Sequence, residues 1–167
     1  LTAYSSEPFI VTLAGNMAFK DKQDFTTGGG PRFVGIGDID GDGKPDLAIP
    51  NQSNHTVSVL LSTSTSGNVS FATKVDFTTG NTPTSVSIGD IDGDGKPDLA
   101  VANGGANTIS VLRNTSTSGT ISFASKVDFS TGANPWNVQI GELHGDGKPD
   151  LATGNANDNT VSELRNI

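Results

Sequence analysis

One acidic stretch recurs three times along the chain at a constant interval of 52 residues. The sequence GDIDGDGKPDLA occupies residues 37–48 and is repeated unchanged at 89–100, and the related sequence GELHGDGKPDLA occupies 141–152. Three phenylalanines outside the stretch follow the same interval: Phe19, Phe71 and Phe123. A fixed period without insertions predicts stacked copies of one structural unit, each burying an apolar face against the next.

Each repeat carries the pattern of short β-strands. No segment of helical length places apolar residues at a spacing of 3.6, and Gly, Ser, Thr and Asn are abundant. In the middle repeat, strands are expected at 86–90, 98–103, 107–114 and 121–129, with turn sequences between them. Four short strands per unit is the size of one propeller blade. The predicted fold is therefore all-β, with three four-stranded blades.

The blades are expected to occupy residues 19–167, in units near 26–77, 78–129 and 130–167, after an N-terminal arm or extra strand at 1–18. The third unit has three of the four strands, and residues 19–25 are expected to form a strand that completes it. Closed propellers have four to eight blades. Three blades therefore predict that two chains close one ring, that chains join head to tail in a filament, or that the sequence is part of a larger propeller.

The acidic stretch has the spacing of a calcium-binding loop. Asp38, Asp40, Asp42 and Asp46 stand at positions 1, 3, 5 and 9 of the first copy. Carboxylates that converge on one turn repel each other by about 1 kcal/mol per pair in water and about 4 kcal/mol at an effective dielectric near 20. Calcium accepts six to eight hard oxygen ligands, and the Lys44 carbonyl at position 7 is a further candidate. The equivalent candidates in the second copy are Asp90, Asp92, Asp94, Lys96 and Asp98.

The other positions of the loop favour the same interpretation. Gly41 and Gly43 allow a left-handed backbone, Pro45 biases Lys44 toward an extended conformation, and Ile39 is expected to anchor the loop on its blade. A simple acidic hairpin turn is the alternative, but such a turn needs only one Asp-Gly pair. Magnesium is less favoured because it prefers octahedral geometry and retains its waters.

The third copy keeps the shape of the loop and weakens its ligand set. Glu142 and His144 replace the aspartates at positions 1 and 3. We expect weak or absent calcium binding, and imidazole opens the alternative of a transition metal. Glu163 and Thr153 also replace apolar residues of the other repeats, which predicts a more solvated last blade. The remaining candidates for a weaker third site are Glu142, Asp146, Lys148 and Asp150.

The DIDGDGKPD loop, the preceding strand PTSVSIGD and the following strand DLAVAN resemble the FG-GAP/VCBS repeats of calcium-binding β-propellers, a family that includes the heads of integrin alpha chains. The resemblance covers roughly residues 19–166. It implies calcium as the cofactor, an extracellular or cell-surface location after secretion, and a structural, adhesive or self-assembling role.

Composition argues against several other classes. The net charge of −8 disfavours nucleic acid, and the longest apolar run, at 8–15, is too short to cross a bilayer. The chain has no Cys and only two histidines, His55 and His144, neither beside an evident nucleophile. The GDGKP string lacks the spacing of a phosphate-binding loop. We therefore expect a module without catalysis, with calcium affinity on the order of 10⁻⁴–10⁻³ M, as in extracellular modules.

Trp136, the only tryptophan, follows Pro135 at a position where the other repeats have Arg32 and Thr84. An isolated tryptophan on a loop at the start of a blade is suited to stacking on a sugar or anchoring a protein partner, but packing or subunit contact is the favoured interpretation. The alternative function is therefore a lectin-like, carbohydrate-binding propeller. The expected partners are a second copy of the chain and protein or glycan ligands.

Overall fold

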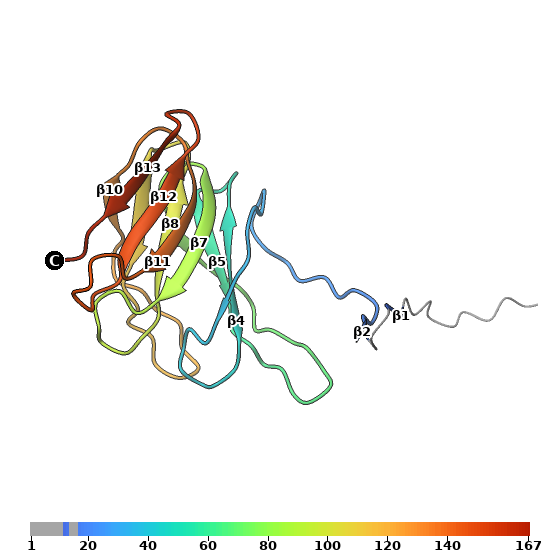
Figure 1. Cartoon of the computed structure of the whole chain (residues 1–167). Helices are drawn as coiled ribbons and strands as arrows, with labels where there is room; N and C mark the ends of the chain where they lie inside the picture. The colour runs from blue at the N-terminus through green and yellow to red at the C-terminus, as the bar shows by residue number, and fades with distance from the viewer. Residues whose placement is uncertain (1–11, 14–16) are drawn as a thin grey trace, which may run out of the picture.

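The computed structural model describes residues 12–13 and 17–167, and the described residues form strands and turns without a helix. Three antiparallel sheets stand side by side along the chain (Figure 1). The all-β prediction and the three repeated sheets are confirmed. The sheets are consistent with propeller blades and are not closed into a ring. A small hairpin, β1 (Thr12–Leu13) with β2 (Met17–Ala18), precedes them.

Each blade is a meander in which consecutive strands are neighbours. Blade one contains β3 (Gly35–Gly37), β4 (Asp46–Asn51), β5 (Thr56–Leu60) and β6 (Val75–Thr78). Blade two contains β7 (Pro83–Gly89), β8 (Asp98–Asn103), β9 (Thr108–Leu112) and β10 (Val127–Ser130). Blade three contains β11 (Pro135–Gly141), β12 (Asp150–Asn155) and β13 (Thr160–Leu164).

The register of the strands repeats with the sequence. Leu47 lies opposite Leu60, Leu99 opposite Leu112, and Leu151 opposite Leu164. Because the side chains of a strand alternate between its two faces, this shared register gives successive blades the same apolar faces.

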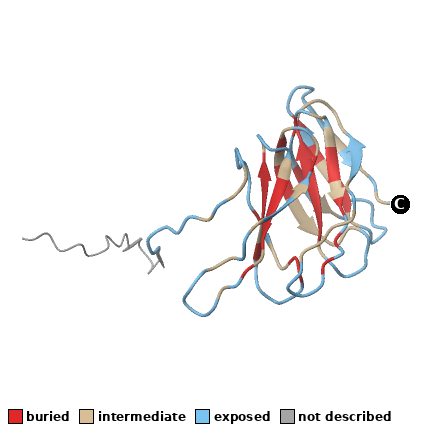
Figure 2. Cartoon of the chain, turned by 180° about the vertical axis from the view of Figure 1, so that it is seen from behind, coloured by how far each residue is buried: buried red, intermediate tan, exposed pale blue. Residues whose placement is uncertain are grey.

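The core lies between the blades. Figure 2 shows buried residues concentrated in the central strands. At the first junction, Val57 and Val59 of blade one belong to one buried cluster with Val86 and Leu99 of blade two. A second cluster joins Ile109 of blade two to residues of blade three, namely Val138 and Leu151. The blades therefore stabilise one another, as expected for stacked repeats.

The fourth strand of blade two is shorter than predicted. The strand expected at 121–129 is confined to β10, and the residues before it make only an isolated bridge between Asn114 and Phe123. Ile121 and Phe123 pack against the cluster of the first junction instead. Burial of these two side chains between the blades draws the chain away from β9, so the expected continuous alternation over 121–129 is wrong.

The strand expected at residues 19–25 is absent, and blade three has three strands among the described residues. Phe25 instead packs edge to face on Phe71, which lies between β5 and β6 of blade one, with ring centroids 4.9 Å apart. Figure 1 places residues 19–25 and β13 at opposite ends of the series of blades. The chain does not complete its own third blade with residues 19–25. Of the arm expected at 1–18, residues 1–11 and 14–16 lie outside the described part.

Candidate metal centres in the acidic loops

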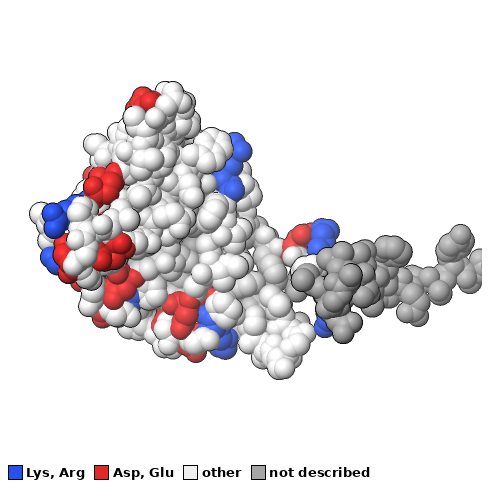
Figure 3. Space-filling model, viewed as in Figure 1, with Lys and Arg blue, Asp and Glu red and all other residues white. Residues whose placement is uncertain are grey.

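Two loops bring three carboxylates together. Asp38, Asp40 and Asp42 lie between β3 and β4, and each offers an oxygen within 4.8 Å of the others. The second loop, between β7 and β8, repeats this arrangement with its own three aspartates: Asp90, Asp92 and Asp94. Six of the predicted ligand residues therefore converge in two identical sets of hard oxygen donors, which suit calcium. Figure 3 shows Asp and Glu side chains gathered in groups along one side of the blades.

The main chain of the loop holds its first aspartate in place. Gly41 N donates to Asp38 Oδ1 over 2.9 Å, and Gly43 N donates to Asp38 Oδ2 over 2.9 Å. Both glycines have positive φ, at 76° and 85°, and the glycines of the second loop have φ of 78° and 87°. The predicted left-handed glycines are confirmed. A side chain at either position would be strained by this backbone conformation.

The aspartates at position 9 close the loops. Asp46 is buried, and its two oxygens accept hydrogen bonds of 2.8 Å from Ile39 N and Ser62 N. In the second loop, Asp98 accepts the equivalent bonds from Ile91 N and Asn114 N, which have the repeat positions of Ile39 and Ser62. Burial raises the pKa of both carboxyls. They lie outside the clusters of three, so their contact with a metal stays a prediction, whereas their role in the loop is visible.

The two lysines at position 7 differ in their contacts. Lys44 Nζ donates to Asp42 Oδ2 over 2.7 Å, and this bond lowers the pKa of Asp42. Lys96 Nζ donates instead to the main-chain oxygen of Ser116 over 3.0 Å. The Lys44 ammonium therefore neutralises a carboxylate of its own loop, whereas the Lys96 ammonium does not. The proposed role of the two lysine carbonyls stays a prediction.

Each of the first two acidic loops is also held by the blade that follows it. Ile39 is buried in the first junction, as expected for an anchor, and its carbonyl accepts a 2.8 Å hydrogen bond from Asn114 Nδ2. Asp40 Oδ2 accepts a 2.7 Å bond from Gly119 N of blade two. Asn166 repeats the asparagine contact toward Ile91 O. Sequence reasoning missed these asparagines, although their separation of 52 residues was a usable signal.

The third loop is organised differently. His144 Nδ1 lies 2.9 Å from Asp150 Oδ2, and His144 Nε2 lies 3.6 Å from Glu163 Oε1. Arg165 Nη2 lies 3.2 Å from Asp146 Oδ2. The groups that converge are therefore His144, Asp150 and Glu163, and not the four predicted candidates. Sequence reasoning did not include Glu163 in this cluster. The signal was a glutamate at a position where the other two repeats have Val59 and Val111.

The carboxylates of the third loop accept hydrogen bonds from other groups of the protein. Glu142 Oε1 accepts from the main-chain nitrogens of His144 and Gly145, over 2.8 and 2.5 Å. The hydrogen bond from Asn166 N and that from the His144 side chain lower the pKa of Asp150 to about 2. The equivalent Asp46 and Asp98 shift in the opposite direction. The third loop thus holds its buried carboxylate in the ionised form with hydrogen bonds and a histidine.

Trp136 lies in a separate place, in a hollow of about 300 Å³. Its side chain is 61% exposed. The hollow gathers residues from all three blades, including Arg32, Phe33, Thr84 and Trp136. Positions 32, 84 and 136 are equivalent in the repeat, so the hollow lies where the first strands of the blades converge.

Stacked antiparallel sheets of three or four strands, each with an acidic loop between its first two strands, define a β-propeller-like repeat protein. The sequence matches the FG-GAP-like repeat over residues 38–101 and again over 90–153, more than half of its length. The chain belongs to the FG-GAP-like repeat family, and the resemblance seen in the sequence is confirmed. No curated protein matches the sequence. The described part of the chain has no helix that could span a membrane.

Proposed function

We propose that the chain is a non-catalytic, calcium-stabilised β-propeller module that acts outside the cell in a structural or adhesive role. The observation that carries the proposal is the pair of identical carboxylate clusters, one around Asp40 and one around Asp92. Each set consists of hard oxygen donors on a turn whose glycines have positive φ. Such a set is typical of calcium sites in proteins.

Calcium would act here on the packing of the blades. Asp40 and Ile39 of the first loop both accept hydrogen bonds from blade two. An ion that neutralises the carboxylates would hold the loop in the shape that presents these two acceptors. Its binding free energy would then add to the stability of the junction by linkage, since the unfolded chain has no such site.

Further observations support the absence of catalysis and a location outside the cell. The His55 ring is engaged, since its Nδ1 accepts a 3.1 Å hydrogen bond from Thr82 N, and His144 is held between two acids. FG-GAP repeats are typical of extracellular proteins. Loops with three carboxylates on an exposed turn are suited to affinities on the order of 10⁻⁴–10⁻³ M, which match extracellular calcium.

Calorimetric titration with calcium and thermal unfolding test the proposal. We expect two calcium ions per chain, one per chain in Asp42→Asn or Asp94→Asn, and two in the control Asp146→Asn of the third loop. A free-ligand excess of 100 over Kd adds about 2.7 kcal/mol per site, so chelation should lower the Tm by several degrees. The proposal would be refuted if the calcium titrations released no heat of binding and chelation left the Tm unchanged.

A second candidate function is carbohydrate binding at the hollow around Trp136. The observation that favours it is an exposed indole beside Phe33, with the amides of Gln52 and Asn137 on the same hollow. Aromatic faces with flanking amides suit sugar rings. Because Trp136 is the only tryptophan, its fluorescence reports binding directly. A glycan array with the protein and with Trp136→Ala decides: binding lost in the variant supports this function, and a blank array removes it.

A further inference from the structure

The two junctions between blades obey one packing rule. A Cβ placed on Gly37 of blade one would lie 3.2 Å from Ile88 of blade two, and a Cβ on Gly89 would lie 3.2 Å from Ile140 of blade three. The glycine at the end of each first strand thus receives the isoleucine of the next blade. Contacts this close admit a Cβ on the glycine only if the isoleucine shifts, which favours glycine at this position.

In the first and last blades, one member of this glycine–isoleucine pair has no partner. A Cβ on Gly141 would meet no heavy atom within 4 Å. Ile36, which has the position of Ile88 and Ile140 in the repeat, is 68% exposed. Val34 is 52% exposed, although its counterparts in blades two and three are buried in the junctions. Val161 is 74% exposed, although its counterpart Ile109 is fully buried. The leading face of blade one and the trailing face of blade three are therefore complementary by construction.

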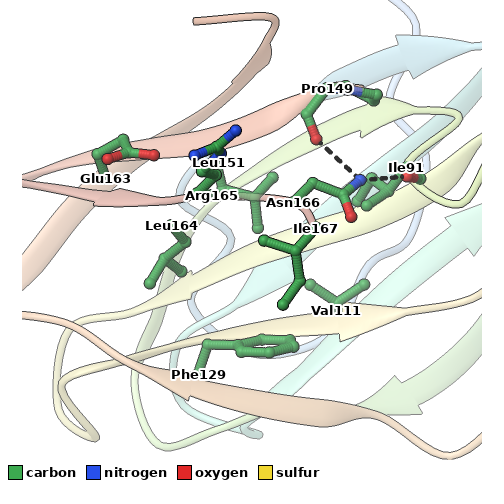
Figure 4. A pocket seen from close by; sticks show the side chains of 10 residues that line it. All are labelled: Ile91, Val111, Phe129, Pro149, Leu151, Glu163, Leu164, Arg165, Asn166 and Ile167. Atoms are coloured by element: carbon green, nitrogen blue, oxygen red, sulfur yellow. Dashed lines mark hydrogen bonds between the residues drawn. The ribbon is translucent and has the colours of Figure 1, made fainter. Parts of the chain in front are cut away.

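An open groove of about 390 Å³ lies between blades two and three, beside β13 (Figure 4). Ile91, Val111, Phe129, Leu151 and Leu164 line it. Residues 52 positions earlier line the first junction, where Ile121 and Phe123 pack into the equivalent place. There Phe123 contacts Phe77 edge to face at 4.9 Å. Phe129 has the position of Phe77, and it lies in the groove with 43% of its surface exposed.

The segment 19–26 has the sequence of the missing occupant. Phe19 has the repeat position of Phe123, and Phe25 that of Phe77 and Phe129. Lys22 pairs with Asp24, as Lys74 pairs with Asp76 and Lys126 with Asp128 in the outer strands of blades one and two. Phe25 already packs on Phe71 as Phe77 packs on Phe123. The segment is thus placed as the outer strand of a blade that would precede blade one.

A polar contact in each complete blade identifies where this segment belongs. Ser110 Oγ donates to Asp128 Oδ1 over 2.6 Å, and Ser58 Oγ donates to Asp76 Oδ1 over 2.5 Å. The equivalent Ser162 accepts hydrogen bonds from Asn155 and Gly132, and its hydroxyl has no acceptor among the residues that the structure describes. Asp24 has the repeat position of the acceptors Asp76 and Asp128. The Ser162 hydroxyl lies on the open edge strand β13, and the Asp24 carboxylate is the acceptor that the repeat pattern assigns to it.

We infer that β13 of one chain receives residues 23–26 of a second copy, and that two copies do this reciprocally to close a ring of six blades. By the register of β9 with β10, Gln23 would lie opposite Glu163, Asp24 opposite Ser162, and Phe25 opposite Val161. Phe19 fills the groove beside Phe129, and Ile36 packs on Gly141. The three blades of residues 17–167, taken twice, give six, which lies within the four to eight blades of known rings.

Molecular mass in solution tests the ring, with light scattering on the 167-residue chain in calcium and in chelator. We expect twice the mass of one chain in calcium, whatever the calcium titrations give. Ile36→Asp and Val161→Asp each change an exposed side chain, so the blades stay folded by circular dichroism and the mass falls to that of one chain. Ser118→Asp, on an exposed tip within blade two, is the control and keeps the dimer. A single-chain mass for the unsubstituted protein overturns the inference, and a filament overturns the closed ring.

Two further experiments test the pairing itself. A mixture of Ile36→Asp with Val161→Asp retains one intact interface, because one variant supplies the trailing face and the other the leading face. We expect dimers in the mixture and none in either variant alone. The chain has no cysteine, so the doubly substituted Gln23→Cys, Glu163→Cys protein reports the register. A disulfide-linked dimer on a non-reducing gel is expected. A disulfide within one chain, or none, would overturn the proposed exchange.

Discussion

The side-chain amide of Asn114 donates a 2.8 Å hydrogen bond to the main-chain oxygen of Ile39, 75 residues earlier in the chain. The same amide donates to Pro97 O over 2.7 Å, so one buried side chain joins blade two to the first acidic loop. Asn166 makes the equivalent pair of bonds to Ile91 O and Pro149 O, which Figure 4 shows as dashed lines. The stability of the first and second acidic loops thus depends on the blade that follows each of them.

Replacing these asparagines should weaken different sets of calcium sites. Asn114→Ala leaves the main-chain oxygens of Ile39 and Pro97 without this donor, which costs about 1–3 kcal/mol of unfolding free energy for each unsatisfied buried group. Because Ile39 belongs to the first loop and Pro97 to the second, we expect reduced affinity at both loops, whereas Asn166→Ala should affect the second loop only. Urea unfolding and calcium titration of the two variants measure both effects. A loss at the first loop in Asn166→Ala, or at one loop alone in Asn114→Ala, would contradict this arrangement.

Thr82 is a second position where the repeats predict a measurable change. It has φ of 55°, a left-handed conformation that β-branched residues avoid, and the equivalent Asn134 has φ of 57°. Asparagine tolerates this region, and strain there costs on the order of 1 kcal/mol or more. Thr82→Asn should therefore raise the free energy of unfolding by about 1 kcal/mol. Chemical denaturation checks the sign, and a destabilised variant would show that the Thr82 side-chain contacts outweigh the strain.

The buried aspartates at position 9 should give opposite pH dependences in chelator. The folded-state pKa of Asp150 is lowered to about 2 from 3.8, so its ionised form stabilises the fold. That contribution is fully present above 3.8 and is lost as the pH falls through about 2. The pKa of Asp98 is raised by burial, so its contribution is largest at low pH and declines as the pH rises above 3.8.

Unfolding of Asp150→Asn and Asp98→Asn against the unsubstituted protein measures this contrast. Relative to that protein, Asp150→Asn should become less stable as the pH rises from about 2 to 4. Asp98→Asn should become more stable as the pH rises further. Parallel profiles for the two variants would show that the environments of the two carboxyls do not differ in this way.

The third loop should gain a calcium site when its substitutions are reversed. Glu142→Asp and His144→Asp together give this loop the four aspartates of blade two, and Glu163→Val gives its neighbour on β13 the valine of blade two. The histidine and glutamate that now converge with Asp150 are then replaced by a ligand and an apolar side chain. We expect calorimetry to show three calcium ions per chain. The single change Glu163→Val serves as the control and should leave the number at two.

The edge-to-face pair of Phe77 and Phe123 should contribute strongly to the first junction. Phe123→Ala removes a side chain that packs on the buried cluster, at a cost of about 3 kcal/mol. Phe129→Ala, in the open groove, should cost less in dilute protein. Under the proposed pairing, its effect on the Tm should grow with protein concentration. Similar losses for the two variants at every concentration would argue against the groove being open.

The sequence was sufficient for the parts of the fold that depend on local spacing. The period located the blades, and the loop pattern correctly placed the left-handed Gly41 and Gly43 and the buried anchor Ile39. It also brought six of the candidate carboxylates together. These features follow from neighbouring residues, whose geometry a turn largely fixes.

The errors lie where contacts between blades decide the structure. The segment 121–126 has a strand pattern, but its apolar side chains are buried between two sheets instead of continuing a ladder. Glu163 is separated from His144 by a whole strand, so only the register of β12 with β13 brings the two together. Residues 19–25 have the composition of an outer strand, but composition does not specify which blade they join.

Ser62 occupies the position at which Asn114 and Asn166 fasten the preceding loops, and its hydroxyl donates to Ser64 instead. In a paired ring this serine would face the third loop, where the calcium ligands are also altered. The bonds within each half would then be reinforced by metal, whereas the two seams between halves would rest on apolar contacts and strand pairing. Such a ring would dissociate at these two interfaces into folded half-rings, and each half-ring could then pair with another copy of the chain.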